Sequence, residues 1–298
     1  MGAPEVSEDR SPATYAGFAG MALIWGSTFL AIRIGNESLP PIWGACVRLV
    51  LATLLYAAVV QLARIPWPRG ASLRAAAIYG LLNYGVSFAL LYWGEVRVAS
   101  GTTAILYATA PLSTAVAAAL FGVQRLDRST IAGALLGLAG VALIFSGELA
   151  HGGPPAALLA IFAAATASSF GSVALKRAPH QSTWTLNGIG TAIGLLVCAP
   201  VSFALGEPHA LPRTLAGWGP VLYLVLAGNL GAYVLFGWLI GKWKVTRVTA
   251  VTLVIPVIAV FLGALIRHEA PPAGTYAGAA LVLAGVAMTL FGRRSATA

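Results

Sequence analysis

TIAGALLGLAGVA at residues 130–142 returns as TYAGAALVLAGVA at residues 275–287, with ten of the thirteen positions identical. The two stretches lie 145 residues apart, and the same offset aligns other landmarks of the chain without a gap. It places Pro111 on Pro256, for example. The 298-residue chain is therefore built from two related units.

The amino-acid composition is that of a protein whose solvent is the lipid bilayer. Hydrophobic residues make up 58% of the chain and charged residues only 9%, against roughly 25% charged residues in soluble domains. A membrane span needs ~20 mostly apolar residues, and ten such stretches use nearly the whole length. They are residues 15–34, 42–62, 73–93, 99–122, 129–147, 154–175, 183–205, 217–240, 248–266 and 273–291.

Each unit carries five of these spans, and an odd number of spans turns the second unit upside down in the membrane relative to the first. Inverted repeats of this kind are the architecture of alternating-access transporters. The sequence therefore predicts an all-α integral membrane protein with ten transmembrane helices in two inverted five-helix repeats. Its expected domains are an N-terminal cytoplasmic tail at residues 1–14 and the two repeats at residues 15–147 and 154–292.

The net charge of +9 is a topology signal rather than a nucleic-acid signal. If the N-terminus is cytoplasmic, thirteen Lys and Arg side chains lie on that side of the spans, and four, namely Arg33, Arg97, Arg213 and Arg267, lie on the other. This positive-inside bias places both termini in the cytoplasm, and it gives that face an attraction for anionic lipid. We expect no nucleic-acid partner.

The sequence shows no pattern for catalysis, for a metal or for a cofactor. The nucleotide-binding pattern GxxxxGK[ST] and the zinc-binding pattern HExxH are absent. Cys46 and Cys198 both fall inside spans, where we expect them to pack as small apolar residues. No acidic residue falls in the middle of a span, where proton-coupled pumps commonly carry one. Because the motifs are absent, we expect neither an enzyme nor a bound cofactor or metal. Because no mid-span carboxylate is available to carry a proton, we expect a uniporter.

Polar side chains are costly to bury in a membrane and usually face the protein interior or a water-filled cavity. Tyr79 and Asn83 share a face of the third span, and Asn229 and Tyr233 share a face of the eighth. The asparagines could orient the polar end of a substrate, while the tyrosines offer a hydroxyl and an aromatic wall. Alternatively, the asparagines tie neighbouring helices together and the rings pack.

Five further residues are candidates for substrate contact or for movement. Trp25 lies halfway along the first span and Tyr107 lies in the fourth, and each could line a cavity or pack in the core. Arg48, the one clear charge within a span, could contact a substrate carboxylate, snorkel outward or bond backbone carbonyls. Pro111 and Pro256 are expected to kink the fourth and ninth spans, and we interpret the matched pair as part of the gating movement.

Two other patterns are interpreted as structural. Glycines spaced along the fifth and tenth spans let helix backbones approach closely; they are Gly133, Gly137, Gly140, Gly274 and Gly278. Tryptophans at the ends of spans are expected to anchor at the membrane interface; they are Trp43, Trp67, Trp93, Trp184, Trp218 and Trp243.

Several motifs together carry a family resemblance that covers essentially the whole chain. They are WGSTFLAIR at residues 25–33, Arg48, ASGTTAILYATAPL at residues 99–112, GALLGLAGVALI at residues 133–144, and its repeat GAALVLAGVAM at residues 278–288. With the five-plus-five organisation, the chain resembles the EamA-type members of the drug/metabolite transporter superfamily, close to the bacterial YddG amino-acid exporters.

The resemblance implies a basket of ten helices in which spans one, three, four, six, eight and nine enclose a central cavity, with spans five and ten as scaffold. It implies export of amino acids, including aromatic and other neutral ones, and of related metabolites, by alternating access across a bacterial inner membrane. Export of drugs or other small metabolites is the alternative, and a structural membrane protein or an intramembrane enzyme is disfavoured. The chain is expected as a monomer or homodimer in contact with lipid. Family members commonly carry a glutamate after spans four and nine, and here Glu269 has Gln124 as its counterpart.

Overall fold

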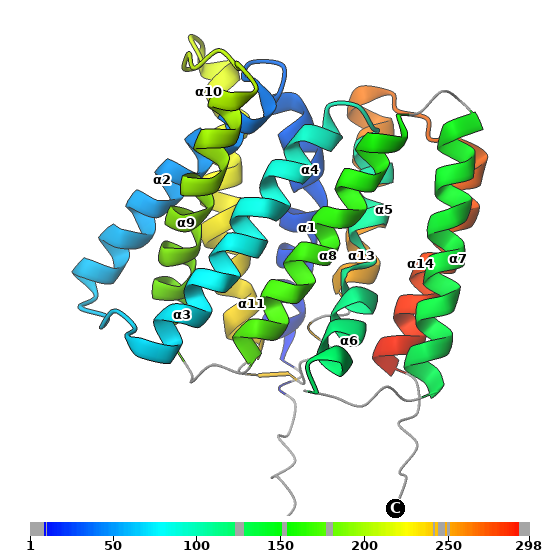
Figure 1. Ribbon diagram of the computed structural model, residues 1–298, viewed down its shortest axis with the longest axis horizontal. Coiled ribbons are helices and arrows are strands. Elements are labelled where there is room, and N and C mark those ends of the chain that lie inside the picture. The colour runs from blue at the N-terminus through cyan, green and yellow to red at the C-terminus, as the bar shows by residue number, and fades with distance from the viewer. Residues whose placement is uncertain are drawn as a thin grey trace, which may run out of the picture.

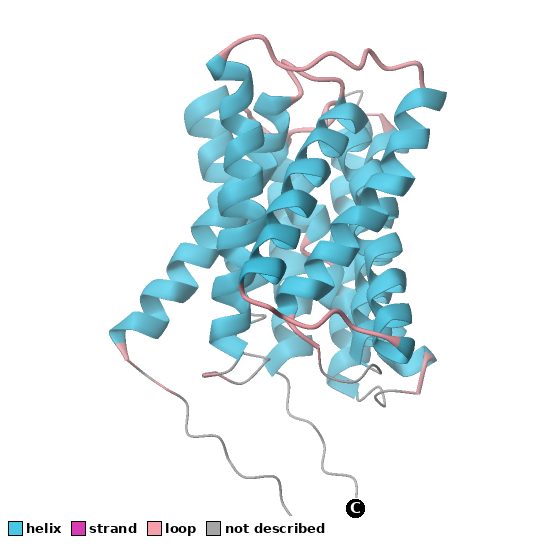
Figure 2. Cartoon of the chain, turned by 90° about the vertical axis from the view of Figure 1, so that its left-hand side faces the viewer, coloured by secondary structure: helices cyan, strands magenta, loops and turns pink. Residues whose placement is uncertain are grey.

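A computed structural model describes residues 9, 11–122, 128–150, 154–176, 181–240, 242–243, 248 and 251–291. Over these residues the chain is helical, without a strand, and its helices run side by side between the two ends of a bundle (Figures 1 and 2). Their bounds are α1 Pro12–Gly35, α2 Pro41–Leu62, α3 Gly70–Tyr79, the π-helix η1 Gly80–Val86, α4 Ser87–Glu95, α5 Ser100–Tyr107, α6 Ala110–Leu120, α7 Arg128–Ala150, α8 Pro155–Lys176, α9 Thr183–Ala204, α10 Leu215–Tyr223, the π-helix η2 Leu224–Gly231, α11 Ala232–Ile240, α13 Val251–Arg267 and α14 Ala273–Phe291.

Ten apolar helical stretches of the described chain match the ten spans expected from the sequence. Seven are long and apolar enough to cross a membrane, and three shorter ones, Ile131–Gly147, Val251–Arg267 and Ala273–Met288, correspond to the fifth, ninth and tenth spans. α1 begins and α14 ends at the same end of the bundle, the lower one in Figure 1. The fold class predicted from the sequence is confirmed.

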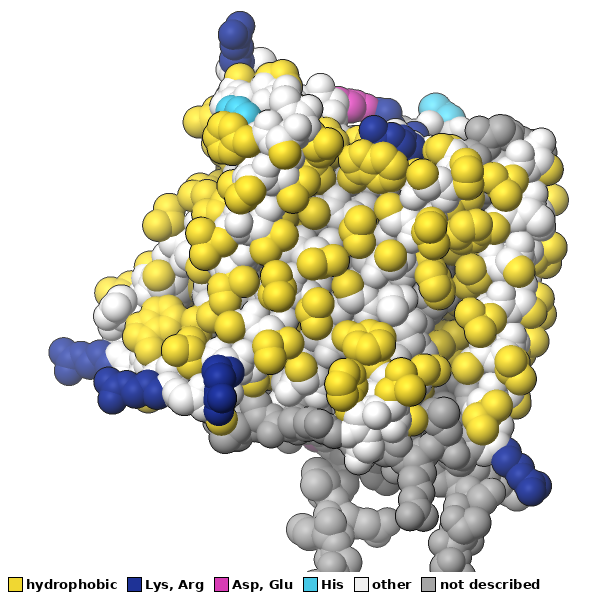
Figure 3. Space-filling model, viewed as in Figure 1, with side chains coloured by type: hydrophobic (Ala, Val, Ile, Leu, Met, Phe, Trp, Pro, Cys, Tyr) yellow, Lys and Arg dark blue, Asp and Glu magenta, His cyan; other side chains and the backbone are white. Residues whose placement is uncertain are grey.

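The outer surface of the bundle suits a lipid environment. On the face drawn in Figure 3, apolar side chains cover the middle, and the charged side chains lie toward the two ends. Large apolar side chains point outward from the spans, among them Leu135 on α7 and Phe261 on α13, which are 63% and 64% exposed. Such exposure is unfavourable in water, but it is the expected surface of a helix that faces hydrocarbon.

α7 and α14, the fifth and tenth spans, pack chiefly on each other at one edge of the bundle (Figure 1). A Cβ added at Gly140 would lie 2.6 Å from the carbonyl oxygen of Gly278, and one added at Gly278 would lie 2.6 Å from that of Gly140. Gly147 and Gly274 also face each other, with each added Cβ 3.2 Å from the other Cα. The close helix approach predicted from the small residues is confirmed.

Spans three and eight each contain a π-helical segment near their centre. η1 separates α3 from α4, and η2 separates α10 from α11. Residue 80 moved by 145 positions is residue 225, so the two segments occupy equivalent places in the repeats. π-helical turns are frequent at functional sites. They also change the number of residues per turn, so a 3.6-residue wheel drawn through either span misplaces side chains beyond the segment.

The fourth span breaks into α5 and α6 just ahead of Pro111, whereas α13 runs through Pro256 without interruption. The Thr109 hydroxyl donates to the Leu106 carbonyl at 2.7 Å, and its counterpart in the second repeat is Val254. A hydroxyl bonded to the backbone competes with the helical ladder, and Val254 has none, which is one difference between the two spans. The expected pair of kinks is therefore unequal, and its gating role stays a prediction.

Candidate functional site

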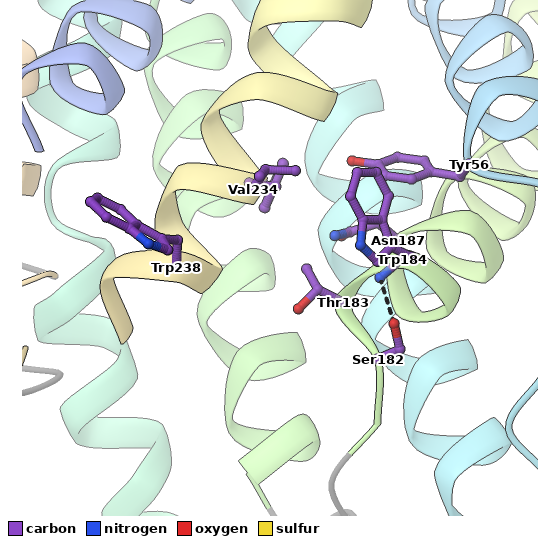
Figure 4. A pocket seen from close by; sticks show the side chains of 8 residues that line it. Tyr56, Ser182, Thr183, Trp184, Asn187, Val234 and Trp238 are labelled. Atoms are coloured by element: carbon purple, nitrogen blue, oxygen red, sulfur yellow. Dashed lines mark hydrogen bonds between the residues drawn. The ribbon is translucent and has the colours of Figure 1, made fainter. Parts of the chain in front are cut away.

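A cavity of about 330 Å³ lies between α2, α9 and α11, toward the end of the bundle where α1 begins. Its lining residues carry no charge; they are Tyr56, Ser182, Thr183, Trp184, Asn187, Tyr233, Val234 and Trp238. In Figure 4, Tyr56, Trp184 and Asn187 form one wall, and Val234 and Trp238 form the other. Aromatic walls with a few polar groups, in a volume of roughly 300–1,000 Å³, are typical of small-molecule sites.

Tyr56 and Trp184 form an aromatic wall that is held in place. Trp184 lies in the first turn of α9, and the Ser182 hydroxyl accepts its backbone N–H at 3.3 Å (Figure 4), which satisfies one of the free donors of the helix N-terminus. The Trp184 and Tyr56 rings meet edge to face at a centroid distance of 6.0 Å. The Tyr56 hydroxyl donates to the backbone carbonyl of Asn229 at 2.8 Å. This wall therefore exists before any substrate arrives.

The facing wall is carried by α11 and supported by α1. The Tyr233 ring contacts Trp25 edge to face at 5.7 Å between centroids. Trp238 packs against Gly17, where an added Cβ would come within 2.6 Å of its ring. Val234 and Trp238 are 43% and 38% exposed, so this wall borders the mouth of the cavity.

Asn187 supplies a polar group to the wall formed by α9. Its side chain is 1% exposed, and its Oδ1 accepts the Tyr84 hydroxyl at 2.8 Å. Its Nδ2 has no hydrogen-bond partner within the described chain. Gly190 and Gly194 leave room on α9 for Tyr84, since a Cβ at Gly190 would lie 2.8 Å from its ring and a Cβ at Gly194 would lie 2.6 Å from its Cβ. Asn187 is not one of the residues predicted to bind substrate, because it lies near the start of its span rather than in the middle.

Arg48 lies on α2, about two turns before Tyr56, and its guanidinium is buried among uncharged side chains. Its Nε donates to Asn229 Oδ1 at 2.7 Å, and its Nη1 donates to the Tyr92 hydroxyl at 3.2 Å. Its guanidinium carbon lies 4.9 Å from the centroid of the Phe88 ring, a cation–π contact. Arg48 is 6% exposed, so it does not snorkel outward, and it is not among the residues that line the cavity. Its contact with a substrate carboxylate stays a prediction.

The polar residues of spans three, four and six pair with one another in the centre of the bundle. Asn83 Oδ1 accepts the hydroxyl of Ser168 on α8, and the hydroxyls of Ser87 and Tyr107 lie 3.1 Å apart. Tyr79 is 7% exposed and belongs to the buried core. These spans, which the resemblance implied would enclose a central cavity, therefore close against each other in this conformation.

The residues that line the cavity come instead from spans two, seven and eight. Of these three spans, only span eight is among those that the resemblance implied would enclose a cavity. Of the side chains predicted to bind substrate, Tyr233 lines the cavity and Trp25 contacts Tyr233; the roles of the others stay predictions. Trp184, which we expected at the membrane interface, lies in the wall. No signal in the sequence distinguishes Tyr56 or Trp238 from a packed ring.

The opposite end of the bundle is closed by ion pairs. Arg33 Nε, near the end of α1, lies 2.8 Å from Glu269 Oε1. The backbone N–H and the hydroxyl of Ser100 donate to Glu269 Oε2 at 2.9 and 2.7 Å, and Arg267 pairs with Glu37. The described residues contain no cluster of His, Cys, Asp or Glu that could hold a metal ion. A cavity at one end and a closed opposite end are what a transporter shows in one of its two access states.

The chain is similar to known membrane transporters along nearly its whole length. A model of the EamA-like transporter family matches residues 13–146 and again residues 155–291. The inner membrane transporter YedA of Escherichia coli strain K12 is 34% identical over 242 residues, which are 81% of this chain and 78% of that protein. A protein of Streptantibioticus cattleyicolor, named a probable terminal-alkyne amino-acid exporter, is 28% identical over 92% of this chain and 93% of its own. A crystal structure of a protein 23% identical to this one has the same fold, with a TM-score of 0.63 over 94% of this chain and 98% of that chain.

Proposed function

The chain belongs to the EamA-like transporter family, and from that premise we propose that it exports amino acids, aromatic and other neutral ones, and related metabolites by alternating access. The cavity between α2, α9 and α11 carries the proposal. Its rings offer an apolar surface to a substrate side chain, and Asn187 offers a hydrogen bond to the polar end. A neutral lining gives a substrate with a net charge no partner for that charge. The relative named as an amino-acid exporter supports the same substrate class.

In the proposed cycle, a second state opens the end that is closed here. The ion pair between Arg33 and Glu269 would separate, and the polar pairs of spans three, four and six would part. Asn83 and Tyr107 would then face the substrate, together with Tyr79, Asn229 and Arg48 from the surrounding helices. The break ahead of Pro111 gives the fourth span a place to bend, and Pro256 is the matching position in the ninth.

The proposed orientation places both termini in the cytoplasm of a bacterial cell and the protein in its inner membrane. The support is the charge asymmetry of the sequence and the name of the inner membrane transporter YedA. With that orientation the cavity opens toward the cytoplasm, where an exporter loads its substrate. We propose uniport, because no acidic residue occupies the middle of a span to carry a proton.

Flux into liposomes that contain only the purified protein tests the proposal. The substrate panel is phenylalanine, leucine, lysine, glutamate and an organic dye cation, each with and without an imposed pH difference. We expect saturable flux of phenylalanine and leucine that is independent of the pH difference, with little flux of lysine or glutamate. Flux of the dye alone would indicate a drug exporter, and accumulation of phenylalanine driven by the pH difference would contradict uniport.

A further inference from the structure

Asn187 holds an unused hydrogen-bond donor against the cavity. The Tyr84 hydroxyl occupies its Oδ1 at 2.8 Å, while its buried Nδ2 has no partner in the part of the chain that the structure describes. An amide donor that is buried without a partner is unfavourable. In Figure 4 the Asn187 side chain points from α9 toward the wall formed by Val234 and Trp238. A bound molecule with a hydrogen-bond acceptor would satisfy this donor.

The position of Asn187 on its helix favours an anionic acceptor. α9 is 22 residues long and begins at Thr183, so Asn187 lies within about one turn of its N-terminus. The N-terminal end of a helix carries a partial positive charge that stabilises negative groups. No acidic side chain lines the cavity to oppose such a group. A carboxylate beside Nδ2 would receive both the hydrogen bond and the field of the helix.

The rings complete a site for the rest of an amino acid. Tyr56 and Trp184 stand on one side of Asn187, and Tyr233 and Trp238 stand on α11. Their faces can hold an aromatic or aliphatic side chain, and they also attract an ammonium group. The cavity can thus accept both charges of a zwitterion, the carboxylate near Asn187 and the ammonium against the rings.

We infer that Asn187 is the specificity-determining residue of this cavity: it binds the carboxylate of a zwitterionic amino acid and so discriminates against amines that lack one. The inference rests on the proposed function and names the contact that recognises the polar end of the substrate. Tyr84 acts as a positioning residue, because its hydroxyl fixes the Asn187 amide with Oδ1 turned away from the ligand.

The test compares phenylalanine with phenethylamine, the same molecule without the carboxylate, on purified full-length protein. Binding is followed by intrinsic tryptophan fluorescence, because two of the eight tryptophans, Trp184 and Trp238, line the cavity. Asn187→Leu removes the donor at similar volume. We expect it to weaken phenylalanine binding about 10–100-fold, the equivalent of a hydrogen bond to a charged group, and to leave phenethylamine binding little changed. Asn187→Asp keeps an acceptor for Tyr84 but replaces the donor by an oxygen, so it should weaken phenylalanine binding and favour phenethylamine.

The outcomes of this comparison separate the role of Asn187 from the proposed transport function. An equal loss for both ligands in Asn187→Leu, or no loss for phenylalanine, would overturn the role of Asn187 while leaving the transport function intact. If Asn187→Leu does not yield folded protein, Asn187→Asp decides, and unchanged selectivity in that variant overturns the inference. If the wild-type protein binds neither ligand and moves no amino acid, the proposed function fails and the inference falls with it.

Discussion

Replacing Gly194 by alanine should disturb the contact that holds Asn187 in position. A Cβ at Gly194 would lie 2.6 Å from the Cβ of Tyr84 and 2.9 Å from its backbone carbonyl carbon and oxygen. Backbone atoms cannot rotate away, so η1 would have to move off α9. Overpacking of this kind costs about 1–3 kcal/mol, and loss of the hydrogen bond from Tyr84 to Asn187 adds about 1 kcal/mol. We expect a total destabilisation of about 2–4 kcal/mol.

Thermal unfolding of the purified variants measures this effect, with Gly20→Ala as the matched control. A Cβ at Gly20 would meet only the end of the Leu235 side chain, at 3.7 Å, which is ordinary contact. Both glycines lie inside helices, so the higher helix propensity of alanine, about 1 kcal/mol, acts equally in the two variants. We expect Gly194→Ala to unfold well below the wild type and Gly20→Ala at or above it. Equal unfolding temperatures for the two variants would refute the reasoning.

Three further substitutions test other parts of the structure. Asn229→Leu removes the acceptor of buried Arg48, so we expect stability to fall by about 1.5–3 kcal/mol, seen as a lower unfolding temperature; an unchanged temperature would show that the guanidinium finds another partner. Glu95 is fully buried and neither carboxylate oxygen has a hydrogen-bond partner among the described residues, and an unpaired carboxylate is costly to bury. Glu95→Gln should therefore unfold at the same temperature or higher, and a marked drop would show that Glu95 makes a necessary ionic contact. Arg33→Gln removes an ion pair from the closed end, so a cysteine at position 98 should react faster with a thiol reagent added outside the cell, and an unchanged rate would mean that this end stays closed without the pair.

The fold could be predicted from the sequence because a membrane helix is encoded locally, as a run of ~20 apolar residues. The span expected at residues 42–62 is α2, Pro41–Leu62, and the one expected at 183–205 is α9, Thr183–Ala204. The π-helical segments could not be predicted in this way, nor could the difference between Pro111, where the fourth span breaks, and Pro256, where α13 is continuous. They depend on where individual backbone groups find hydrogen-bond partners, which a run of apolar residues does not specify.

The site was harder to predict because the facing of a side chain depends on its tertiary partners. A 3.6-residue wheel predicts that Asn229 and Tyr233 share one face of the eighth span, but Asn229 accepts a hydrogen bond from Arg48 while Tyr233 lines the cavity. Asn83 is paired with Ser168 across the bundle. Asn187 has the same side chain as Asn83 and Asn229, but it lies about one turn from the start of its helix, whereas they lie near the middle of their spans, so an argument from mid-span polar residues does not find it.

The most direct test of the central claim places a removable block in the cavity itself. Val234→Cys puts a thiol on its exposed wall, and the native Cys46 and Cys198 are both fully buried, where thiols react poorly. Flux of phenylalanine is measured in liposomes before and after a membrane-permeant disulfide-forming reagent, and again after reduction. We predict that modification stops flux, that phenylalanine slows the modification and that reduction restores transport. Full flux through protein completely modified at position 234 would contradict the account.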